Sequence, residues 1–177
     1  PCPQGTFSSL NGSTECTKCP TGTYLNITGA ISVSQCTPCP VGQYADATGS
    51  TACLACPIGT FANIAGSTTC QSCLAGTYAN QTGTVSCSTC PAGTYSELTK
   101  QTSIASCIQC SAGYYSSTIG ASSKAACVPC AAGSYSNATG ASDISLCTPC
   151  PKGMYSESQA STKCLECEKG KYNSATG

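Results

Sequence analysis

Cysteine is the residue type in this chain whose number and spacing could support chemistry. There are 19 cysteines in 177 residues, and most of them recur in the pattern Cys-x-x-Cys-Pro-x-Gly-x-Tyr. Cysteines at this spacing serve as zinc ligands, as redox-active dithiols or as parts of a disulfide framework. The chain has no His to complete a mixed zinc site, and its Ser/Thr-rich composition favours secretion into an oxidising compartment. We therefore expect structural disulfides, no metal and no cofactor.

The cysteines divide the chain into repeats of 17 or 20 residues. We call the second Cys of each Cys-x-x-Cys the anchor cysteine and count positions from it. Position 3 is always Gly, position 5 is always Tyr or Phe, and position 10 is Gly except at Lys100 and Ala160. A unit this short cannot bury a core alone, so it must be covalently closed and stacked on its neighbours. The anchors are Cys2, Cys19, Cys39, Cys56, Cys73, Cys90, Cys110, Cys130, Cys150 and Cys167.

These repeats predict a single tandem array over residues 1–177, in which each unit is a small irregular hairpin. A short extended piece surrounds the aromatic residue, and a polar turn of the Asn-x-Thr-Gly type follows it. The two glycines meet a need for positive φ or for close backbone approach. Longer repeats carry three extra residues after position 10, which indicates a tolerant loop. The predicted fold class is a small disulfide-rich repeat solenoid of short β-hairpins, stacked as an elongated rod with little or no helix.

Two disulfide schemes are compatible with equivalent repeats. Either each Cys-x-x-Cys closes on itself, or each anchor bonds the next cysteine along the chain. We favour the second scheme because it closes every hairpin, with a loop worth roughly 3 kcal/mol, whereas a bond inside Cys-x-x-Cys is typical of reactive redox pairs. It gives Cys2–Cys16, Cys19–Cys36, Cys39–Cys53, Cys56–Cys70, Cys73–Cys87, Cys90–Cys107, Cys110–Cys127, Cys130–Cys147 and Cys150–Cys164, and we expect the partner of Cys167 to lie beyond Gly177.

The position 5 aromatics are expected to supply most of the core. Ten of the eleven aromatic residues lie at this position, Tyr114 being the exception, and there is no Trp. One ring per repeat can pack against the disulfide and the ring of the next repeat. A sugar-binding or ligand-binding ladder of rings is the alternative use of the same residues.

The motif resembles that of known extracellular repeats. Pro3-Gln4-Gly5-Thr6-Phe7 and Pro91-Ala92-Gly93-Thr94-Tyr95 are similar to the start of the ephrin-receptor-like cysteine-rich repeat and of the first-half module of tumour-necrosis-factor-receptor ectodomains. This resemblance covers nearly the whole chain and implies the hairpin-closing disulfides. Leu74, Ser111, Ala131 and Glu168 replace the Pro of the motif. The interlocked second module of the tumour-necrosis-factor receptors does not occur.

Composition excludes several functions. Seven Lys, no Arg and a formal net charge of zero give no basic patch for nucleic acid. No apolar run is long enough to span a membrane. Without His or Arg, and with scattered carboxylates such as Asp46, Glu97 and Glu157, the chain offers no catalytic constellation, so we predict that it is not an enzyme. Residues 47–96 carry no charge, which favours self-association into fibres or lateral bundles.

Four acceptor sequons predict attached glycans. Asn26, Asn80 and Asn137 all lie at position 7, in the predicted turn, and Asn11 heads a fourth sequon. Sugars at these positions would also supply solubility that the few charged residues do not.

We predict a structural extracellular or cell-surface glycoprotein, a disulfide-laddered rod that forms a stalk or the subunit of a surface filament. The alternative is a receptor or adhesin ectodomain that recognises a ligand or glycan, with residues 90–147 as the candidate region because of their longer loops and Tyr114. Since the chain opens at Pro1-Cys2 and stops at Gly177, both inside a repeat, we expect it to be an excerpt of a longer array.

Overall fold

A computed structural model describes residues 1–174 and residue 176. Gly177, the position 10 residue of the last repeat, lies outside the described residues. The chain forms two compact units. Unit 1 comprises Pro1–Cys73, Ala79–Ser88 and Lys100–Thr102, and unit 2 comprises Leu74–Tyr78, Thr89–Thr99 and the residues from Ser103 onward.

Every strand is two residues long, and every helix is one turn of 3-10 helix. The strands are β1 Thr6–Phe7, β2 Thr17–Lys18, β3 Thr23–Tyr24, β4 Thr37–Pro38, β5 Gln43–Tyr44, β6 Leu54–Ala55, β7 Thr60–Phe61, β8 Gln71–Ser72, β9 Thr77–Tyr78, β10 Ser88–Thr89, β11 Thr94–Tyr95, β12 Ile108–Gln109, β13 Tyr114–Tyr115, β14 Val128–Pro129, β15 Ser134–Tyr135, β16 Thr148–Pro149, β17 Met154–Tyr155 and β18 Leu165–Glu166. The 3-10 turns are η1 Val33–Gln35, η2 Ile104–Ser106, η3 Lys124–Ala126 and η4 Ile144–Leu146.

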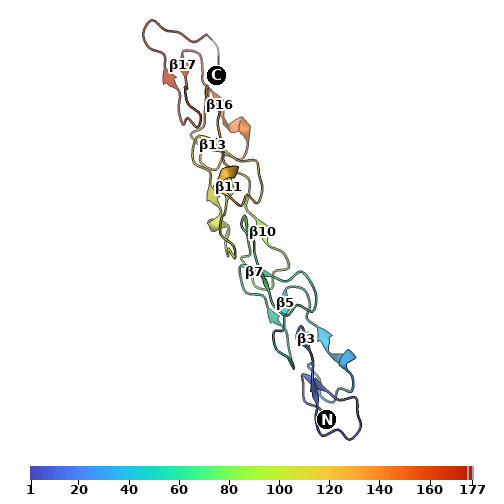
Figure 1. Cartoon of the computed structure of the whole chain (residues 1–177). Coiled ribbons are helices and arrows are strands. Elements are labelled where there is room, and N and C mark those ends of the chain that lie inside the picture. The colour runs from blue at the N-terminus through green and yellow to red at the C-terminus, as the bar shows by residue number, and fades with distance from the viewer. Residues whose placement is uncertain (175, 177) are drawn as a thin grey trace. The chain divides into compact units, whose positions relative to one another are not determined.

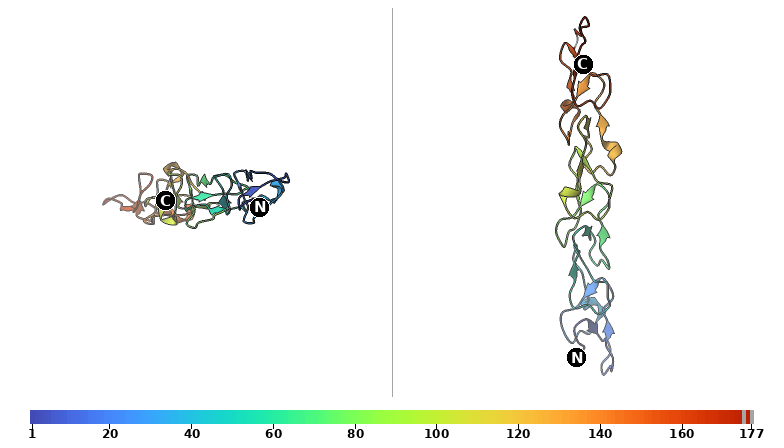
Figure 2. Two further views of the ribbon diagram at one scale, coloured as in Figure 1. Left: turned by 90° about the horizontal axis from the view of Figure 1, so that it is seen from below. Right: turned by 90° about the vertical axis from the view of Figure 1, so that its left-hand side faces the viewer.

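The strands form antiparallel hairpins, each contained within one repeat. In unit 1 the pairs are β1–β2, β3–β4, β5–β6 and β7–β8, and in unit 2 they are β11–β12, β13–β14, β15–β16 and β17–β18. Within each unit successive hairpins follow one another in chain order (Figures 1 and 2). The position 5 aromatic always faces the residue after the closing cysteine, as Tyr44 faces Leu54. The prediction of stacked short hairpins with little or no helix is confirmed.

Adjacent repeats are joined by a set of backbone hydrogen bonds that recurs along both units. The amide of position 3 donates to the position 6 carbonyl of the next repeat, and the amide of position 6 donates to its position 11 carbonyl. Returning bonds run from positions 10 and 0 of the next repeat. For the repeats anchored at Cys39 and Cys56, the four bonds are Gly42 N to Ala62 O at 2.7 Å, Ala45 N to Ser67 O at 3.1 Å, Gly66 N to Cys39 O at 2.7 Å and Cys56 N to Gly42 O at 2.9 Å.

The buried core lies at the anchor cysteines and at position 6. Anchors such as Cys39 and Cys90 are completely buried. Both backbone polar groups of position 6 bond to adjacent repeats, and the residue there is Ala or Ser in every repeat from the one anchored at Cys39 to the one anchored at Cys130, whereas the repeat anchored at Cys19 has the larger Leu25. The buried residues at position 6 are Leu25, Ala45, Ala62, Ala79, Ser96, Ser116, Ser136 and Ser156.

The position 5 aromatics, which were expected to supply most of the core, are not among its fully buried residues. From Phe7 to Tyr155 these rings are half-buried, and Tyr172 is 87% exposed. The expected packing of a ring against the disulfide of the next repeat is found at the N-terminal repeat. Phe7 packs there against a cluster formed by Cys19, Leu25, Ala30 and Cys36 of the next repeat.

The two glycines of the repeat serve different needs. Both have positive φ, but position 3 also lies against the carbonyl of position 10 two repeats further on. A Cβ on Gly22 would overlap the carbonyl oxygen of Gly66, whereas a Cβ on Gly66 would make ordinary contacts with a side-chain carbon of Pro38 at 3.7 Å and with Gly22 O at 3.9 Å. Position 3 therefore needs Gly for space as well as for φ. Position 10 can accept another residue at the cost of an unfavourable φ, as Lys100 does at 60° and Ala160 at 59°.

We expect Lys100→Gly to stabilise its turn by up to about 1 kcal/mol, because Gly removes the penalty of the left-handed conformation. The Lys100 amide donates to Cys73 O at 2.7 Å, so slower hydrogen exchange at this amide is the readout. Lys152→Gly, at an exposed position without positive φ, is the control. Faster hydrogen exchange at the residue 100 amide in Lys100→Gly would contradict the interpretation that Lys100 is conformationally strained.

The three extra residues of the longer repeats form the 3-10 turns. A side chain caps each turn: Ser32, Ser103, Ser123 or Asp143 accepts a hydrogen bond from the amide two residues later. At η1 the Gln35 carboxamide also accepts the backbone N–H of Ser32, completing a capping box. The insertions are thus ordered capped turns rather than only tolerant loops.

Candidate functional site

The cysteines form a ladder of nine disulfides among the residues that the structure describes. Each joins an anchor to the next cysteine, at a sequence separation of 14 or 17 and with Cα–Cα distances of 5.5–5.8 Å. The bonds are Cys2–Cys16, Cys19–Cys36, Cys39–Cys53, Cys56–Cys70, Cys73–Cys87, Cys90–Cys107, Cys110–Cys127, Cys130–Cys147 and Cys150–Cys164. Cys167 is half-buried and has no disulfide partner in the described part of the chain.

The disulfides leave little for metal chemistry. A cysteine ligates zinc as a thiolate, and eighteen of the nineteen sulfur atoms are bonded to one another instead. Within residues 1–174 and 176, no group of three or more His, Cys, Asp or Glu side chains is placed to hold a metal ion.

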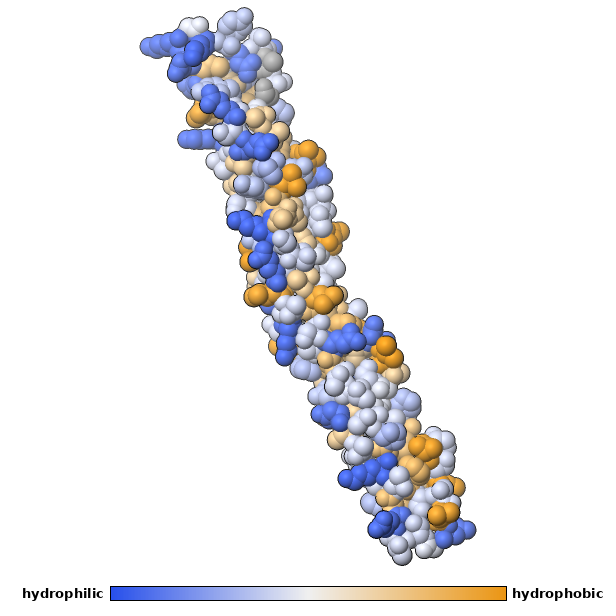
Figure 3. All heavy atoms as spheres, in the orientation of Figure 1, coloured by the Kyte–Doolittle hydropathy of each residue, from blue (hydrophilic) through white to orange (hydrophobic). Residues whose placement is uncertain are grey.

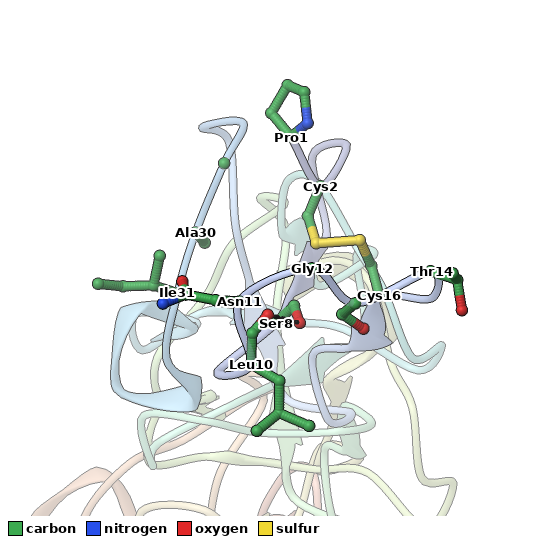
Figure 4. Close-up of a pocket in the computed structure, with 12 residues that line it drawn as sticks. Pro1, Cys2, Ser8, Leu10, Asn11, Gly12, Thr14, Cys16, Ala30 and Ile31 are labelled. Carbon is green, nitrogen blue, oxygen red and sulfur yellow. Dashed lines mark hydrogen bonds between the residues drawn. A yellow bond between two sulfur atoms is a disulfide. The ribbon is translucent and has the colours of Figure 1, made fainter.

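The sequon asparagines are all accessible. Asn26, Asn80 and Asn137 each follow the buried position 6 residue, and their side chains are exposed. Asn11 is exposed in the first repeat, near the Cys2–Cys16 disulfide (Figure 4). The cavity around Asn11 is about 420 Å³ and is lined by small and aliphatic residues such as Leu10 and Ile31, without a charged side chain. Its polar lining side chains are Asn11 and the hydroxyl residues Ser8, Ser13 and Thr14.

The carboxylates are dispersed along the chain, and Glu168 forms a surface ion pair with Lys171 at 3.0 Å. Asp46, Glu97 and Glu157 are exposed at position 7 of three different repeats. Asp143 is engaged locally, because its carboxylate accepts the backbone N–H of Ser145 at 2.8 Å as the cap of η4. This backbone bond, followed by a bond from the Ser145 side chain, lowers the pKa of Asp143 below its ordinary value.

A pH titration should detect this cap. Because folding lowers the pKa of Asp143, its contribution to stability is complete above the pKa of the unfolded chain and is lost as pH falls through the folded pKa. We expect the Asp143 carboxyl and the Ser145 amide to titrate together in NMR spectra, at a lower pH than the Asp carboxyl of a short unstructured peptide that contains residues 141–147 with Ser in place of Cys147. The Ala105 and Ala125 amides, which are capped by serine hydroxyls, are internal controls and should not follow this transition. Equal midpoints for Asp143 in the folded chain and in the peptide would contradict the interpretation.

The surface carries many aliphatic side chains. Each repeat from the one anchored at Cys2 to the one anchored at Cys150 exposes at least one large aliphatic residue, including Leu10 at 74%, Ile64 at 64% and Leu74 at 71%. Figure 3 shows such residues as separate orange patches among pale polar ones. The cysteine spacing did not predict that these aliphatic side chains are exposed, although their hydrophobic type is evident from the sequence.

One cavity in unit 2 differs from its surroundings in its chemistry. It has a volume of about 370 Å³ and is lined by Tyr95, Ser111, Tyr114, Lys124 and Cys127. It thus combines two phenol rings, one ammonium group, one hydroxyl and one disulfide sulfur. It lies inside the 90–147 region that the sequence nominated for recognition.

Comparison with protein families identifies the repeat. A family profile described as tyrosine-protein kinase ephrin type A/B receptor-like matches residues 1–36, 32–69, 59–107 and 142–177. The chain belongs to this family. The profile covers most of the sequence, and the predicted resemblance to the ephrin-receptor-like cysteine-rich repeat is confirmed. A comparison with curated proteins found no significant match.

Membership of the ephrin type A/B receptor-like family fits a disulfide-rich domain of an extracellular type. The family is a receptor-like repeat and not a family of enzymes. Among the residues described for this family member, no helix has the length and apolar character required to cross a membrane.

Proposed function

We propose that this chain is part of an extracellular structural glycoprotein that forms a stalk or a surface filament through self-association. The observation that carries the proposal is the repetition of one scheme. In both units the same backbone bonds join successive hairpins and one disulfide closes each hairpin, so the fold resists extension at every step. An array built in this way is suited to a stalk or filament, which must keep its length under load.

The surface supports association between copies. The exposed aliphatic residues recur from repeat to repeat, and residues 47–96 carry no charge that would keep copies apart. Ile64 and Leu74 lie in this uncharged segment and are more than half exposed. Contacts between copies would remove such side chains from water.

Sedimentation velocity and electron microscopy test this function on material secreted with its disulfides intact. We expect concentration-dependent association and fibres or bundles. Ile64→Lys combined with Leu74→Lys should weaken association, because each adds a charge to the uncharged segment without affecting a buried residue. Thr162→Lys, at an exposed polar position outside that segment, is the matched control. A monomer at all concentrations, or equal association of the Lys variants, would argue against assembly through this surface.

The proposal includes glycans at Asn11, Asn26, Asn80 and Asn137. All four side chains are exposed, which leaves room for a bulky sugar on the folded chain. Mass spectrometry of peptides from the secreted protein, before and after enzymatic removal of N-linked sugars, measures occupancy. Asparagines that remain unmodified in secreted material would contradict this part of the proposal.

A further inference from the structure

The cavity lined by Tyr95, Ser111, Tyr114, Lys124 and Cys127 lies between the repeats anchored at Cys90 and Cys110, both of which contribute to it within unit 2. Tyr95 comes from β11 of the first repeat. The other four residues come from the second repeat, including its closing cysteine. The same backbone hydrogen bonds recur between successive repeats within the unit. The residues that line this cavity can therefore be compared with those at the same positions in the other long-loop repeats.

Two substitutions distinguish this place from its counterparts. Tyr114 lies at position 4, where the other long-loop repeats have Thr23, Thr94 and Ser134. Lys124 begins the 3-10 turn, where the others have Val33, Ile104 and Ile144. In those repeats the position 4 hydroxyl bonds to the position 1 carbonyl, and an aliphatic residue begins the turn. Tyr114 and Lys124, the two residues that differ, line the same cavity.

The backbone on either side of the cavity is held in place. Tyr114 N donates to Ser111 O at 3.1 Å, and Tyr95 is bridged to Ala121 of the next repeat. Lys124 follows the cap Ser123, and its own amide donates to Glu97 Oε1 at 3.1 Å. Glu97 thus ties the start of η3 to the preceding repeat. The Lys124 side chain supplies the charged group among the lining residues.

We propose that this cavity binds a hexuronic acid unit of an acidic polysaccharide. Half-buried phenol rings offer apolar faces to the C–H faces of a pyranose and hydroxyl groups to its edge. The Lys124 ammonium can make a charge-assisted bond to the sugar carboxylate, and Ser111 adds a further hydroxyl. A single pyranose suits the volume of about 370 Å³. This recognition goes beyond the structural role proposed above and does not depend on self-association.

NMR titration of the disulfide-bonded chain with methyl glucuronide tests the site. We expect saturable shifts of the Tyr95 and Tyr114 rings and of the Lys124 amide, with a Kd on the order of a millimolar, as is normal for a ligand of this size. Methyl glucoside, which has the same ring without the carboxylate, should bind at least about tenfold more weakly because it lacks the charge-assisted bond.

The variants borrow residues from neighbouring repeats, so the fold should tolerate them. Lys124→Ile introduces the residue type found at the equivalent Ile144, and Tyr114→Thr introduces the type found at the equivalent Thr94. Each variant should raise the Kd for the glucuronide at least about tenfold. Lys163→Ile, an exposed Lys outside the cavity, should leave it unchanged. Unaltered amide spectra in the other repeats verify folding. Absence of saturable shifts, equal binding of the glucoside, or an unchanged Kd in Lys124→Ile would overturn the proposal.

Discussion

Full reduction of the disulfides is expected to unfold this chain at moderate temperature without denaturant. The buried residues are mainly the anchor cysteines and small Ala or Ser side chains, which release little free energy on burial. Each disulfide closes a loop of 14 or 17 residues, which the chain-entropy model values at roughly 3 kcal/mol. Without these constraints the two-residue strands cannot stay paired. Near-UV circular dichroism and amide exchange of the reduced, alkylated chain measure the loss.

Removal of a single disulfide provides a graded version of the same test. Replacing both Cys39 and Cys53 by Ser should cost about 2–4 kcal/mol locally. Protection should fall first at the amides of Cys56 and Gly66, which bond to this repeat. The amides of the repeat anchored at Cys130 report on the rest of the chain and should stay protected. Retained protection throughout a fully reduced chain would show that packing alone suffices.

Gly93→Ala is expected to be much more disruptive than Gly140→Ala, although both residues have positive φ and lie on opposite sides of one contact. A Cβ on Gly93 would overlap the carbonyl oxygen of Gly140, and neither backbone can move without breaking the ladder. The left-handed conformation and the overpacking together should cost about 2–5 kcal/mol. A Cβ on Gly140 would instead meet the flexible side chain of Gln109 at 3.3 Å, so only the conformational cost of about 1–2 kcal/mol applies.

Native-state hydrogen exchange distinguishes the two Gly variants. The Gly140 amide donates to Cys110 O at 2.8 Å, and the Gly93 amide donates to Ser116 O at 2.8 Å. In Gly93→Ala we expect both bonds to lose protection, whereas in Gly140→Ala the Gly93 amide should stay protected. The native Ala160, at the position equivalent to Gly140, shows that position 10 can hold a Cβ. Equal losses in the two variants would contradict the steric distinction.

The spacing of the cysteines was sufficient to predict the hairpin fold, because a regular array allows few equivalent bonds and few shapes for a closed loop. The same regularity identified the two glycine positions and the family resemblance. It could not separate the roles of the glycines. The contact of Gly22 with Gly66 joins repeats that are two apart, and no local pattern encodes a separation of that kind.

The burial of position 6 could not be predicted from the sequence pattern either. Ala45 and Ser96 look like ordinary small residues of a polar turn, yet they are almost completely buried by the ladder. The rings of Tyr44 and Tyr95 look like a core and are only half-buried. In a stack, burial is decided by which backbone faces approach each other, and hydrophobicity alone does not give that information.

The sequence by itself determined that this protein consists of short hairpins closed by disulfides, with glycosylation sequons and a formal net charge of zero. Only the tertiary structure decided which small side chains fill the core and which glycines are irreplaceable. It also brought Tyr95, Tyr114 and Lys124 to a single cavity. The reason is that cysteine spacing constrains contacts within a repeat, whereas contacts between repeats depend on how the closed loops stack.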